Sequence, residues 1–508
     1  MKTRIGIIAD DLTGAGDAGL QFFRKGIVTW VKASLPDEPR SDDRDDAIPA
    51  PAPFDAATSV SPAVLEGASF LSGSVPDIGS SAFADILDGA RFEAVAINAG
   101  GRSLDSPRAA DGVARAVAWL RALGCQAFFH KIDSTLRGNV GPEVRRLLEE
   151  LSCDLAIVAP AFPEAGRATI GGFQLVQGLP VALSDYGRDP VTPVTESHVP
   201  TLLQAAGCPT ELVDLRTVVG GWERIVGAVA EAVARGGRAI VVDAARPVDM
   251  VAIARAIAHL GPKVLPVGSG GLAQALGPER RQANELLSVV PAARSRDDRQ
   301  EPLPGAELRA RTRQLPVLAI SGSCNPVTLD QIDALREGAR IVVVDVRRLL
   351  LTDAHQELES TAREALQGLL AGRDVVVTTA ASAEQVQVDQ ALGLDLGLAA
   401  WQLGEQLGLA LGALAQRLVA TAELSGLILA GGQTAAAVCR ALGAETFEIV
   451  DEVMPTIPVL RPLVAQSRRN EPASGLEFQL VTKSGGFGPP DALARIARHL
   501  RQRAVAAR

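Results

Sequence analysis

Aromatic residues and cysteine motifs are scarce in this sequence. Only 4% of the 508 residues are aromatic, with a single Tyr, and the net charge is −9 at pH 7. Nucleic-acid binding calls for a basic face and stacking side chains, so the composition argues against a nucleic-acid partner. The five cysteines lie far apart and form no CxxC pair. This predicts reduced thiols and neither a disulfide framework nor a zinc site.

Long apolar segments are missing as well. No uncharged apolar stretch reaches the length of a membrane span, and the run after residues 1–4 is too short for a secretory signal. We therefore expect a cytoplasmic protein with no membrane partner. Two nucleotide-binding signatures are also absent. There is no Gly-x4-Gly-Lys-Ser/Thr loop, and no Gly-x-Gly-x-x-Gly follows the first predicted strand, which weighs against a dinucleotide-dependent oxidoreductase.

The length of the chain predicts two domains, because 508 residues are too many for one hydrophobic core. Short Val- and Ile-rich runs alternate with amphipathic helical stretches. The predicted fold class is therefore α/β: two domains, each a mainly parallel sheet covered by helices, with the active site in the interdomain cleft. We place the first domain at 1–275, a linker at 276–314 and the second domain at 315–508. Residues 34–84, rich in Pro, Ala, Ser and Asp, are interpreted as a flexible insertion.

The expected strands and helices can be given by residue range. The predicted strands are Ile5–Ala9, Ala94–Asn98, Ala127–His130, Leu155–Ala159, Ala239–Val242, Val317–Ile320, Ile341–Val344, Asp374–Thr378 and Leu427–Leu429. The predicted helices include Asp111–Leu123, Pro142–Leu151, Trp222–Arg235 and Val248–Leu260.

Two carboxylates, Asp10 and Asp11, follow the first predicted strand and precede the turn that opens a helix. In open α/β sheets, ligands bind at the carboxyl ends of the strands. The two side chains could accept substrate hydroxyls, act as a general base or hold Mg²⁺. A helix N-cap needs only one such residue. We therefore predict that both are functional, as catalytic and substrate-binding residues.

More polar side chains follow two other predicted strands of the first domain. Lysine and arginine flank acidic and hydroxyl residues in one short loop, and a second strand ends in an asparagine and a Gly-Gly-Arg turn. Such loops can bind a carboxylate through an arginine fork and a lysine charge, and hydroxyls through the acidic side chains. The predicted substrate-binding residues here are Lys131, Asp133, Ser134, Arg137, Asn98 and Arg102.

The second half has loops of glycine and hydroxyl residues in place of carboxylates. Glycines allow backbone N–H groups to approach phosphate oxygens, and the N-terminus of a following helix favours negative charge. A lysine beside such a loop could balance phosphate charge. We predict a nucleotide cradle made of Ser321, Ser323, Gly431, Gly432, Gln433, Thr434, Lys483, Gly485 and Gly486.

Two further segments of the first domain are less informative. Arg167 follows a rigid loop that contains two prolines, and it is either a candidate anion contact or part of a structural loop. The glycine-rich residues 267–272 are interpreted as either structural or lining the cleft.

These motifs together resemble the four-carbon acid sugar kinase family over nearly the whole chain outside 34–84 and 291–314. The segments that carry the resemblance are Ile8–Ala15, Lys131–Asn139, Ala159–Pro163, Ser321–Ser323, Gly431–Thr434 and Lys483–Gly488. The chain departs from the family pattern at Asn98-Ala99-Gly100-Gly101-Arg102, where relatives often have Asn-Thr-Glu-Ser/Thr-Arg. It also has Gln433 where relatives often have Glu.

The resemblance implies an N-terminal domain that binds the acid and a C-terminal domain that binds ATP, with Mg²⁺ as a further cofactor. The implied reaction is ATP-dependent phosphorylation of a small-molecule sugar acid, of D-threonate or D-erythronate type, at its terminal hydroxyl. The alternatives are a 3-oxo-tetronate kinase and a non-catalytic sugar-acid or nucleotide sensor. A homodimer is possible. The metal ligands and the identity of the catalytic base stay open.

Overall fold

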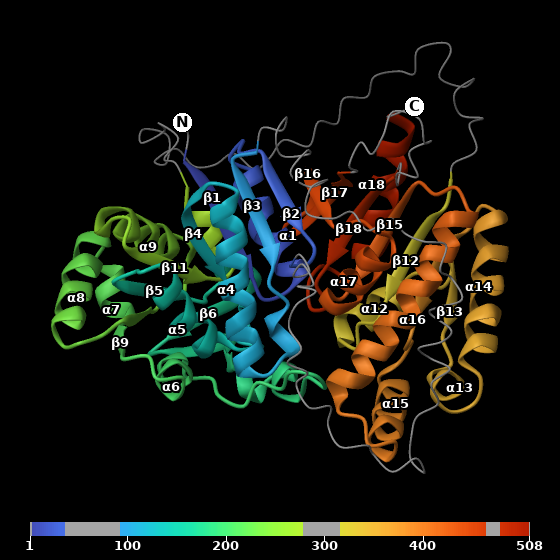
Figure 1. Ribbon diagram of the computed structural model, residues 1–508, viewed down its shortest axis with the longest axis horizontal. Coiled ribbons are helices and arrows are strands. Elements are labelled where there is room, and N and C mark those ends of the chain that lie inside the picture. The colour runs from blue at the N-terminus through green and yellow to red at the C-terminus, as the bar shows by residue number, and fades with distance from the viewer. Residues whose placement is uncertain (1–2, 36–91, 278–314, 464–477, 507–508) are drawn as a thin grey trace, which may run out of the picture.

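The computed structural model describes residues 3–35, 92–277, 315–463 and 478–506. It confirms the α/β class, with strands in the middle of each half and helices on both sides (Figure 1). Nearly all of the predicted insertion at 34–84 and of the predicted linker at 276–314 lies outside the described residues.

The first half contains a parallel sheet. Its strand order is β2-β3-β1-β4-β11-β5-β10-β9, and every neighbouring pair is parallel. The strands are β1 (Arg4–Ala9), β2 (Thr29–Lys32), β3 (Ala94–Asn98), β4 (Cys125–Lys131), β5 (Leu155–Ala159), β9 (Thr210–Val213), β10 (Ala239–Val242) and β11 (Val264–Gly268). A separate antiparallel sheet consists of β6 (Arg167–Ile170), β7 (Phe173–Val176) and β8 (Leu179–Pro180).

Helices cover both faces of this sheet because successive strand residues point to opposite sides. Ile7 belongs to the core cluster that includes Leu12 and Leu272, whereas Ile8 belongs to the cluster that includes Val113 and Val144. The helices on the Ile7 side are α1 (Leu12–Phe23), α7 (Leu215–Val219), α8 (Trp222–Ala234), α9 (Pro247–Leu260) and α10 (Gly270–Ala275). Those on the Ile8 side are α4 (Ser106–Ala122), α5 (Val140–Glu150) and α6 (Val199–Ala205).

The second half has a parallel block of strands and an antiparallel hairpin. The block has the order β13-β14-β12-β15-β18, and the hairpin β16–β17 follows β18. The strands are β12 (Val317–Ser321), β13 (Ala339–Val343), β14 (Asp374–Thr378), β15 (Gly426–Ala430), β16 (Thr446–Met454), β17 (Ile457–Pro462) and β18 (Gln479–Lys483). The helices are α12 (Pro326–Asp333), α13 (Val346–Leu351), α14 (Ala354–Leu370), α15 (Ala383–Asp395), α16 (Ala400–Thr421), α17 (Gly432–Ala441) and α18 (Ala492–Ala506).

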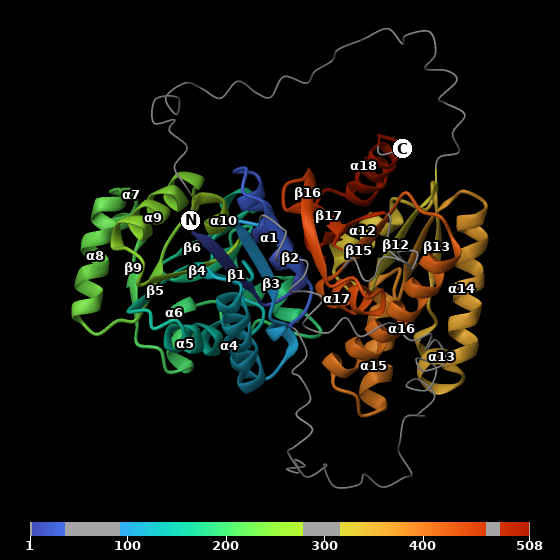
Figure 2. The same ribbon diagram turned by 45° about the horizontal axis from the view of Figure 1, so that its top comes forward.

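The two parallel blocks are joined edge to edge, which the sequence did not lead us to expect. β16 pairs antiparallel with β2, so a single 15-stranded sheet runs through both halves (Figure 2). In a flat sheet the two blocks would therefore run in opposite directions. A twist of about 20–25° per strand over the steps from β1 to β15 adds up to most of a half-turn. The carboxyl ends of β1 and β15 can therefore face the same space.

All nine predicted strands exist: four have the predicted bounds, and the ends of the other five differ by at most two residues. The predicted start of one helix was wrong. α4 begins at Ser106 and not at Asp111, because the Asp105 carboxylate accepts a hydrogen bond from the Arg108 N–H and Pro107 fits the first turn. Sequence reasoning missed β2, β6–β9, β11 and β16–β18, most of which are short or lie next to polar residues.

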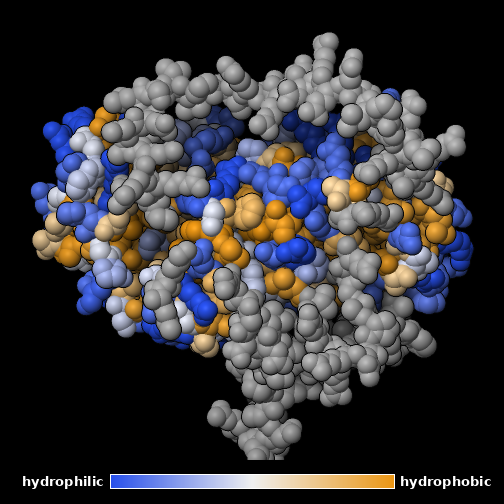
Figure 3. All heavy atoms as spheres, turned by 90° about the horizontal axis from the view of Figure 1, so that it is seen from above, coloured by the Kyte–Doolittle hydropathy of each residue, from blue (hydrophilic) through white to orange (hydrophobic). Residues whose placement is uncertain are grey.

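In the space-filling view from above, hydrophobic and hydrophilic side chains are interspersed over the visible face (Figure 3). In the described part of the chain, no helix combines the length and the apolar character needed to cross a membrane. The five cysteines are free thiols.

Candidate functional site

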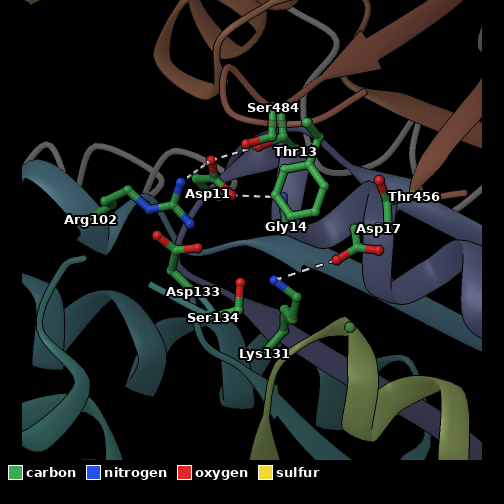
Figure 4. A pocket seen from close by; sticks show the side chains of 12 residues that line it. Asp11, Thr13, Gly14, Asp17, Arg102, Lys131, Asp133, Ser134, Thr456 and Ser484 are labelled. Atoms are coloured by element: carbon green, nitrogen blue, oxygen red, sulfur yellow. Dashed lines mark hydrogen bonds and ion pairs between the residues drawn. The ribbon is translucent and has the colours of Figure 1, made fainter. Parts of the chain in front are cut away.

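A pocket lies where the carboxyl ends of the first-half strands face the second half. Its lining comes from both halves: Asp11, Thr13, Gly14, Asp17, Arg102, Lys131, Asp133, Ser134, Gly270, Thr456, Ser484 and Phe487. Figure 4 shows Arg102, Asp11, Asp133, Lys131 and Asp17 around one space, with Ser484 of the second half above them.

Asp11 forms one wall of the pocket and also begins α1. Its Oδ1 accepts a hydrogen bond from the Gly14 N–H at 2.6 Å, and its Oδ2 accepts one from the Thr13 hydroxyl at 2.7 Å. The N-cap interpretation that we weighed against function is therefore correct for Asp11. It does not exclude function, because the same carboxylate lines the pocket.

Arg102 ties the two aspartates together. It lies in the 3₁₀ turn η1 (Gly101–Ser103) after β3, and its Nε and Nη2 donate to the two oxygens of Asp10 at 2.8 and 2.9 Å. Its Nη1 donates to Asp11 Oδ2 at 2.5 Å. Burial raises the pKa of Asp10, and Arg102 opposes this shift. Repulsion from the carboxylates of Asp11 and Asp133 raises the pKa of Asp10 further. Burial alone would lower the pKa of Arg102, but the aspartates raise it well above its ordinary value.

Gly138 makes the close approach of Arg102 possible. It has a φ of 96°, which favours glycine, and a Cβ at this position would lie 3.3 Å from both the Arg102 Cα and Asp10 Oδ2. Leu136, in the same loop, is a buried non-glycine residue with a φ of 60°. Left-handed backbone of this kind is strained and recurs at functional loops.

The end of β4 supplies Lys131 to the pocket, and the loop after it supplies Asp133 and Ser134. Lys131 Nζ lies 3.7 Å from Asp17 Oδ2, which is longer than a hydrogen bond. Asp133 accepts from the Thr135 hydroxyl and from Arg137 Nε, both at 2.6 Å. Burial alone would raise the pKa of Asp133, but Arg137 and Arg102 lower it well below its ordinary range. Asp133 is therefore an anion that Arg137 holds in place and that the charge of Arg102 also stabilises.

Besides Asp10, two further residues from the predicted substrate set, Asn98 and Arg137, do not line the pocket. Asn98 uses its amide to shape the end of β3: its Nδ2 donates to the Ala33 carbonyl and its Oδ1 accepts from the Gly100 N–H, both at 2.8 Å. Arg137 pairs with Asp133 and with Asp189, and its guanidinium lies 5.2 Å from the ring centre of Tyr186. Both residues support the loops that carry the pocket-lining side chains.

Several pocket residues were not assigned from the sequence. Asp17 lies one helical turn after Thr13, a spacing that the sequence made visible. Burial raises the pKa of Asp17. Gly270 has both of the roles proposed for its segment, because it lines the pocket and begins α10, which Ser269 caps. Thr456 sits in the β16–β17 turn with a φ of 71°, and nothing in the sequence pointed to it.

The three glycine and hydroxyl loops of the second half begin at the same level. Ser321 pairs with Ala430, and Ala430 pairs with Lys483, so β12, β15 and β18 end in register. The third loop thus also follows a strand, which the sequence did not indicate. The loops pack closely: a Cβ on Gly485 would lie 2.5 Å from the Ser323 hydroxyl.

The remaining loop residues complete this cradle. Gly431, with a φ of 102°, leads directly into α17, whose first turn contains Gly432, Gln433 and Thr434. A Cβ on Gly322 would lie 2.5 Å from the Thr434 hydroxyl. Side chains larger than hydrogen at these glycines would fill the space beside the N-terminus of α17.

Lys483 is fully buried at the end of β18. Its Nζ donates to the carbonyl oxygens of Ser484 at 2.9 Å and Gly485 at 3.1 Å, and to the Thr328 hydroxyl at 3.3 Å. All three partners are neutral, and within the described residues no carboxylate forms an ion pair with it. Burial lowers the pKa of Lys483 to about 7.

The two halves touch at glycines. A Cβ on Gly432 would lie less than 3 Å from the Asp11 carboxylate, and one on Gly486 would lie less than 3 Å from the Tyr186 hydroxyl. α1 contacts α17 and the strands β16, β17 and β18. The carboxylate cluster of the first half thus lies directly against the glycine loops of the second.

Comparisons with known proteins agree with this division. Residues 5–276 match a family model described as a sugar-binding N-terminal domain, and residues 318–493 match one described as a nucleotide-binding C-terminal domain. A solved Salmonella typhimurium structure covers 98% of this chain and 99% of its own, with a TM-score of 0.66 and 23% identity, which supports the fold. The fold and the site thus define a two-part α/β protein with sugar-binding and nucleotide-binding regions.

Curated relatives give the family. The chain is 31% identical to a Salmonella typhimurium D-threonate kinase over 96% of both chains. It is 29% identical to a Heliobacterium modesticaldum D-erythronate kinase, covering 96% of this chain and 94% of the relative. It is 30% identical to a Methylobacterium radiotolerans 3-oxo-tetronate kinase, covering 97% and 99%. The chain belongs to the four-carbon acid sugar kinase family.

Proposed function

We propose that this protein transfers the γ-phosphate of ATP to the terminal hydroxyl of a four-carbon sugar acid of D-threonate or D-erythronate type. One observation carries the proposal: the Asp10–Arg102–Asp11 cluster lies beside a pocket that Ser484 and Phe487 of the third glycine loop also line, and the three glycine loops begin in register. Phosphoryl transfer requires positioning and charge balance more than covalent chemistry. A site built from both halves offers this positioning.

The nucleotide fits the second half because of its backbone. The loops from Ser321 to Ser323, Gly431 to Thr434 and Gly485 to Gly486 would hold the phosphates through N–H groups, at the N-terminus of α17. Lys483 would balance phosphate charge, since its present partners are neutral. We place acid binding in residues 3–277 and nucleotide binding in residues 315–506.

Mg²⁺ fits as an ion carried mainly by the nucleotide. Within the described residues, no group of three or more His, Cys, Asp or Glu side chains is arranged as a metal site. Kinases commonly bind Mg²⁺ through substrate phosphates with one or two carboxylates. Asp11, which lies against Gly432, is the carboxylate that could contribute. When bound, the ion would neutralise charge on the phosphates.

The sugar acid would lie on the first-half loops. Lys131 is the best candidate for its carboxylate, because its neighbouring anion, Asp17, lies beyond hydrogen-bond distance. Ser134 and Asp133 would meet its hydroxyls. Asp11 lines the pocket, whereas Asp10 lies behind it and fixes Arg102 through two hydrogen bonds. We therefore assign Asp11 to the attacking hydroxyl and Asp10 to the positioning of Arg102.

The reaction balances with these groups. The substrate oxygen forms a bond to the γ-phosphorus while the bond from that phosphorus to the bridging oxygen of ADP breaks. The hydroxyl proton passes to the Asp11 carboxylate, and ADP leaves with the electron pair of the broken bond. Contact between the halves at Gly432 and Gly486 would exclude water from this step.

An ADP-release screen tests the proposal. The purified chain would be mixed with Mg²⁺-ATP and each stereoisomer of threonate, erythronate and 3-oxo-tetronate, with Asp11→Asn as the inactive control. We expect release that depends on D-threonate or D-erythronate. Selective use of 3-oxo-tetronate would favour the second candidate, which the Methylobacterium relative supports. If no isomer causes ADP release, the kinase proposal is wrong and the protein is a non-catalytic binding protein.

A further inference from the structure

Arg167 is a buried arginine whose charge has no carboxylate partner among the described residues. It begins β6, and only 6% of the residue is exposed. The other two arginines beside the carboxylate cluster, Arg102 and Arg137, each pair with two aspartates. A guanidinium that is removed from water normally requires such compensation. Arg167 is therefore the exception among these three arginines.

The contacts of Arg167 are all neutral. Its Nη1 donates to the Ala165 carbonyl at 2.8 Å, its Nη2 donates to the Tyr186 hydroxyl at 3.3 Å, and its Nε has no hydrogen-bond partner among the residues that the structure describes. Its guanidinium lies 4.5 Å from the ring centre of Phe487, in the other half. A cation over an aromatic face is stabilised, but this contact does not use the Nε–H donor or the second N–H of each terminal nitrogen.

The position of Arg167 places it beside the loop proposed to hold phosphates. Phe487 and Ser484 line the pocket, and the Tyr186 hydroxyl, which contacts Arg167, lies against Gly486. A group bound over the backbone of Ser484–Gly486 would lie near the unused donors. The chemistry that satisfies a buried arginine fork is a phosphate, which accepts two parallel hydrogen bonds.

We propose that Arg167 is a further catalytic residue, which contacts a phosphate of the nucleotide on the Ser484–Phe487 loop and stabilises the γ-phosphoryl group during transfer. This rests on the proposed kinase function and deepens it. The first half thereby supplies a cation to a nucleotide held by the second half. Because Arg167 reaches that loop across the interface, the charge is in place only when the halves are together.

The test compares Arg167→Met with Arg167→Lys and with a matched control, Arg188→Met. Methionine at position 167 keeps an apolar contact with Phe487 but removes the guanidinium, whereas lysine keeps a positive charge. Arg188 is an exposed arginine two residues from Tyr186. We expect kcat to fall by about 10³-fold or more in Arg167→Met, the range for arginines that stabilise a transferring phosphoryl group. Arg167→Lys should recover little, and Arg188→Met should equal the parent.

Two further readouts separate phosphate binding from a purely structural contact. Arg167→Met should weaken binding of a non-hydrolysable ATP analogue much more than binding of AMP, and added guanidinium ion should restore part of the lost activity. Phe487→Leu removes the ring but keeps the arginine, so its loss should be much smaller. Equal losses in Phe487→Leu and Arg167→Met, without guanidinium rescue, would overturn the proposal in favour of a structural contact.

The outcomes also separate this proposal from the kinase assignment. If the parent phosphorylates a four-carbon acid and Arg167→Met keeps its kcat and its ATP affinity within about threefold, the Arg167 proposal fails and the kinase assignment stands. If the parent phosphorylates no acid, the kinase assignment fails. The comparison of the ATP analogue with AMP then still decides whether Arg167 binds phosphate. If Arg167→Met does not fold, the same measurements would be made on Arg167→Lys.

Discussion

The two sides of the pocket handle charge in different ways. In the first half, two of the three arginines considered above are paired with carboxylates: Arg102 bridges Asp10 and Asp11, and Arg137 bridges Asp133 and Asp189. In the second half, Lys483 is surrounded by neutral oxygens. A hydroxylated substrate needs oriented acceptors that exist before it binds, whereas phosphates bring their own negative charge. The carboxylate side is therefore preformed, and the glycine side is completed by its ligand.

The largest effect is expected from Asp11→Asn, which removes the proposed proton acceptor. Asn caps helices as well as Asp does, so the start of α1 should persist. We expect kcat to fall by about 10²–10⁴-fold, the usual contribution of a general base, with a smaller loss of stability than in Arg102→Gln, because Arg102 keeps both hydrogen bonds to Asp10. Steady-state kinetics and a thermal scan measure both. If Asp10→Asn lost more activity than Asp11→Asn, the roles we give the two aspartates would be reversed.

Arg102→Gln would remove the positive charge that balances the carboxylate side, and it would leave Asp10, Asp11 and Asp133 buried together. Removing one partner of a buried ion pair costs about 3–5 kcal/mol of unfolding free energy. The pKa of Asp10, already raised by burial, should rise further. The folded variant would then hold a proton that the unfolded chain has lost. Its stability should therefore fall as pH rises from the unfolded pKa near 3.8 through the raised one.

Urea unfolding at pH 5 and pH 8 tests this prediction. The stability difference between Arg102→Gln and the parent should be larger at pH 8. Arg336→Gln, at an exposed arginine paired with the exposed Asp333, is the control and should cost about 1 kcal/mol or less. An Arg102→Gln protein as stable as the parent at pH 8 would contradict the view that this arginine balances the cluster.

Gly432→Ala tests the contact between the two sides. Alanine is better than glycine in a helix, yet here its Cβ would meet the Asp11 carboxylate at less than 3 Å. A misplacement of about 1 Å at a reacting group can cost about 10²-fold in rate, and we expect a loss of that order in kcat/KM. Gly227→Ala, in α8 with no atom within 4 Å of the new Cβ, is the control and should keep full activity. Equal activity in both variants would mean that the halves need not meet here.

The sequence predicted the parts of the site that follow a strand directly. Asp10, Asp11 and Lys131 stand where an apolar run ends, and their residue types limit the chemistry they can do. Thr456 escaped prediction because it reaches the pocket only through the β16–β17 hairpin and the pairing of β16 with β2. No local pattern encodes such a long-range contact.

The same limit explains where the assignments of single residues changed. Asn98 has the residue type of a substrate ligand, but its amide is engaged by the Ala33 carbonyl and the Gly100 N–H. The sequence left Arg167 equally open to an anion contact and to a structural role. Two features of the structure separate it from a structural arginine: it has no carboxylate partner among the described residues, and it contacts Phe487. Partners in space, and not residue type, decided both cases.

The smallest effect concerns the protonation of Lys483. Burial lowers its pKa to about 7, so at pH 8 about nine-tenths of the side chain is neutral in the free protein. Phosphates of bound ATP would favour the charged form and raise that pKa again. Binding of a non-hydrolysable ATP analogue at pH 8 should therefore take up somewhat less than one proton.

Calorimetry in two buffers of different ionisation enthalpy measures this uptake, and Lys483→Met is the matched control, since it removes the amine and keeps the apolar stem. The lowered pKa also makes the free protein more stable as pH rises from about 7 towards 10.5, because the unfolded chain binds the proton more tightly in that range. The Met variant should lose this slope. Equal proton uptake in the parent and the variant would show that the protonation of Lys483 does not respond to phosphate. The negative charge of the ligand would then not be balanced by Lys483, and the proposed difference between the glycine side and the carboxylate side would not hold.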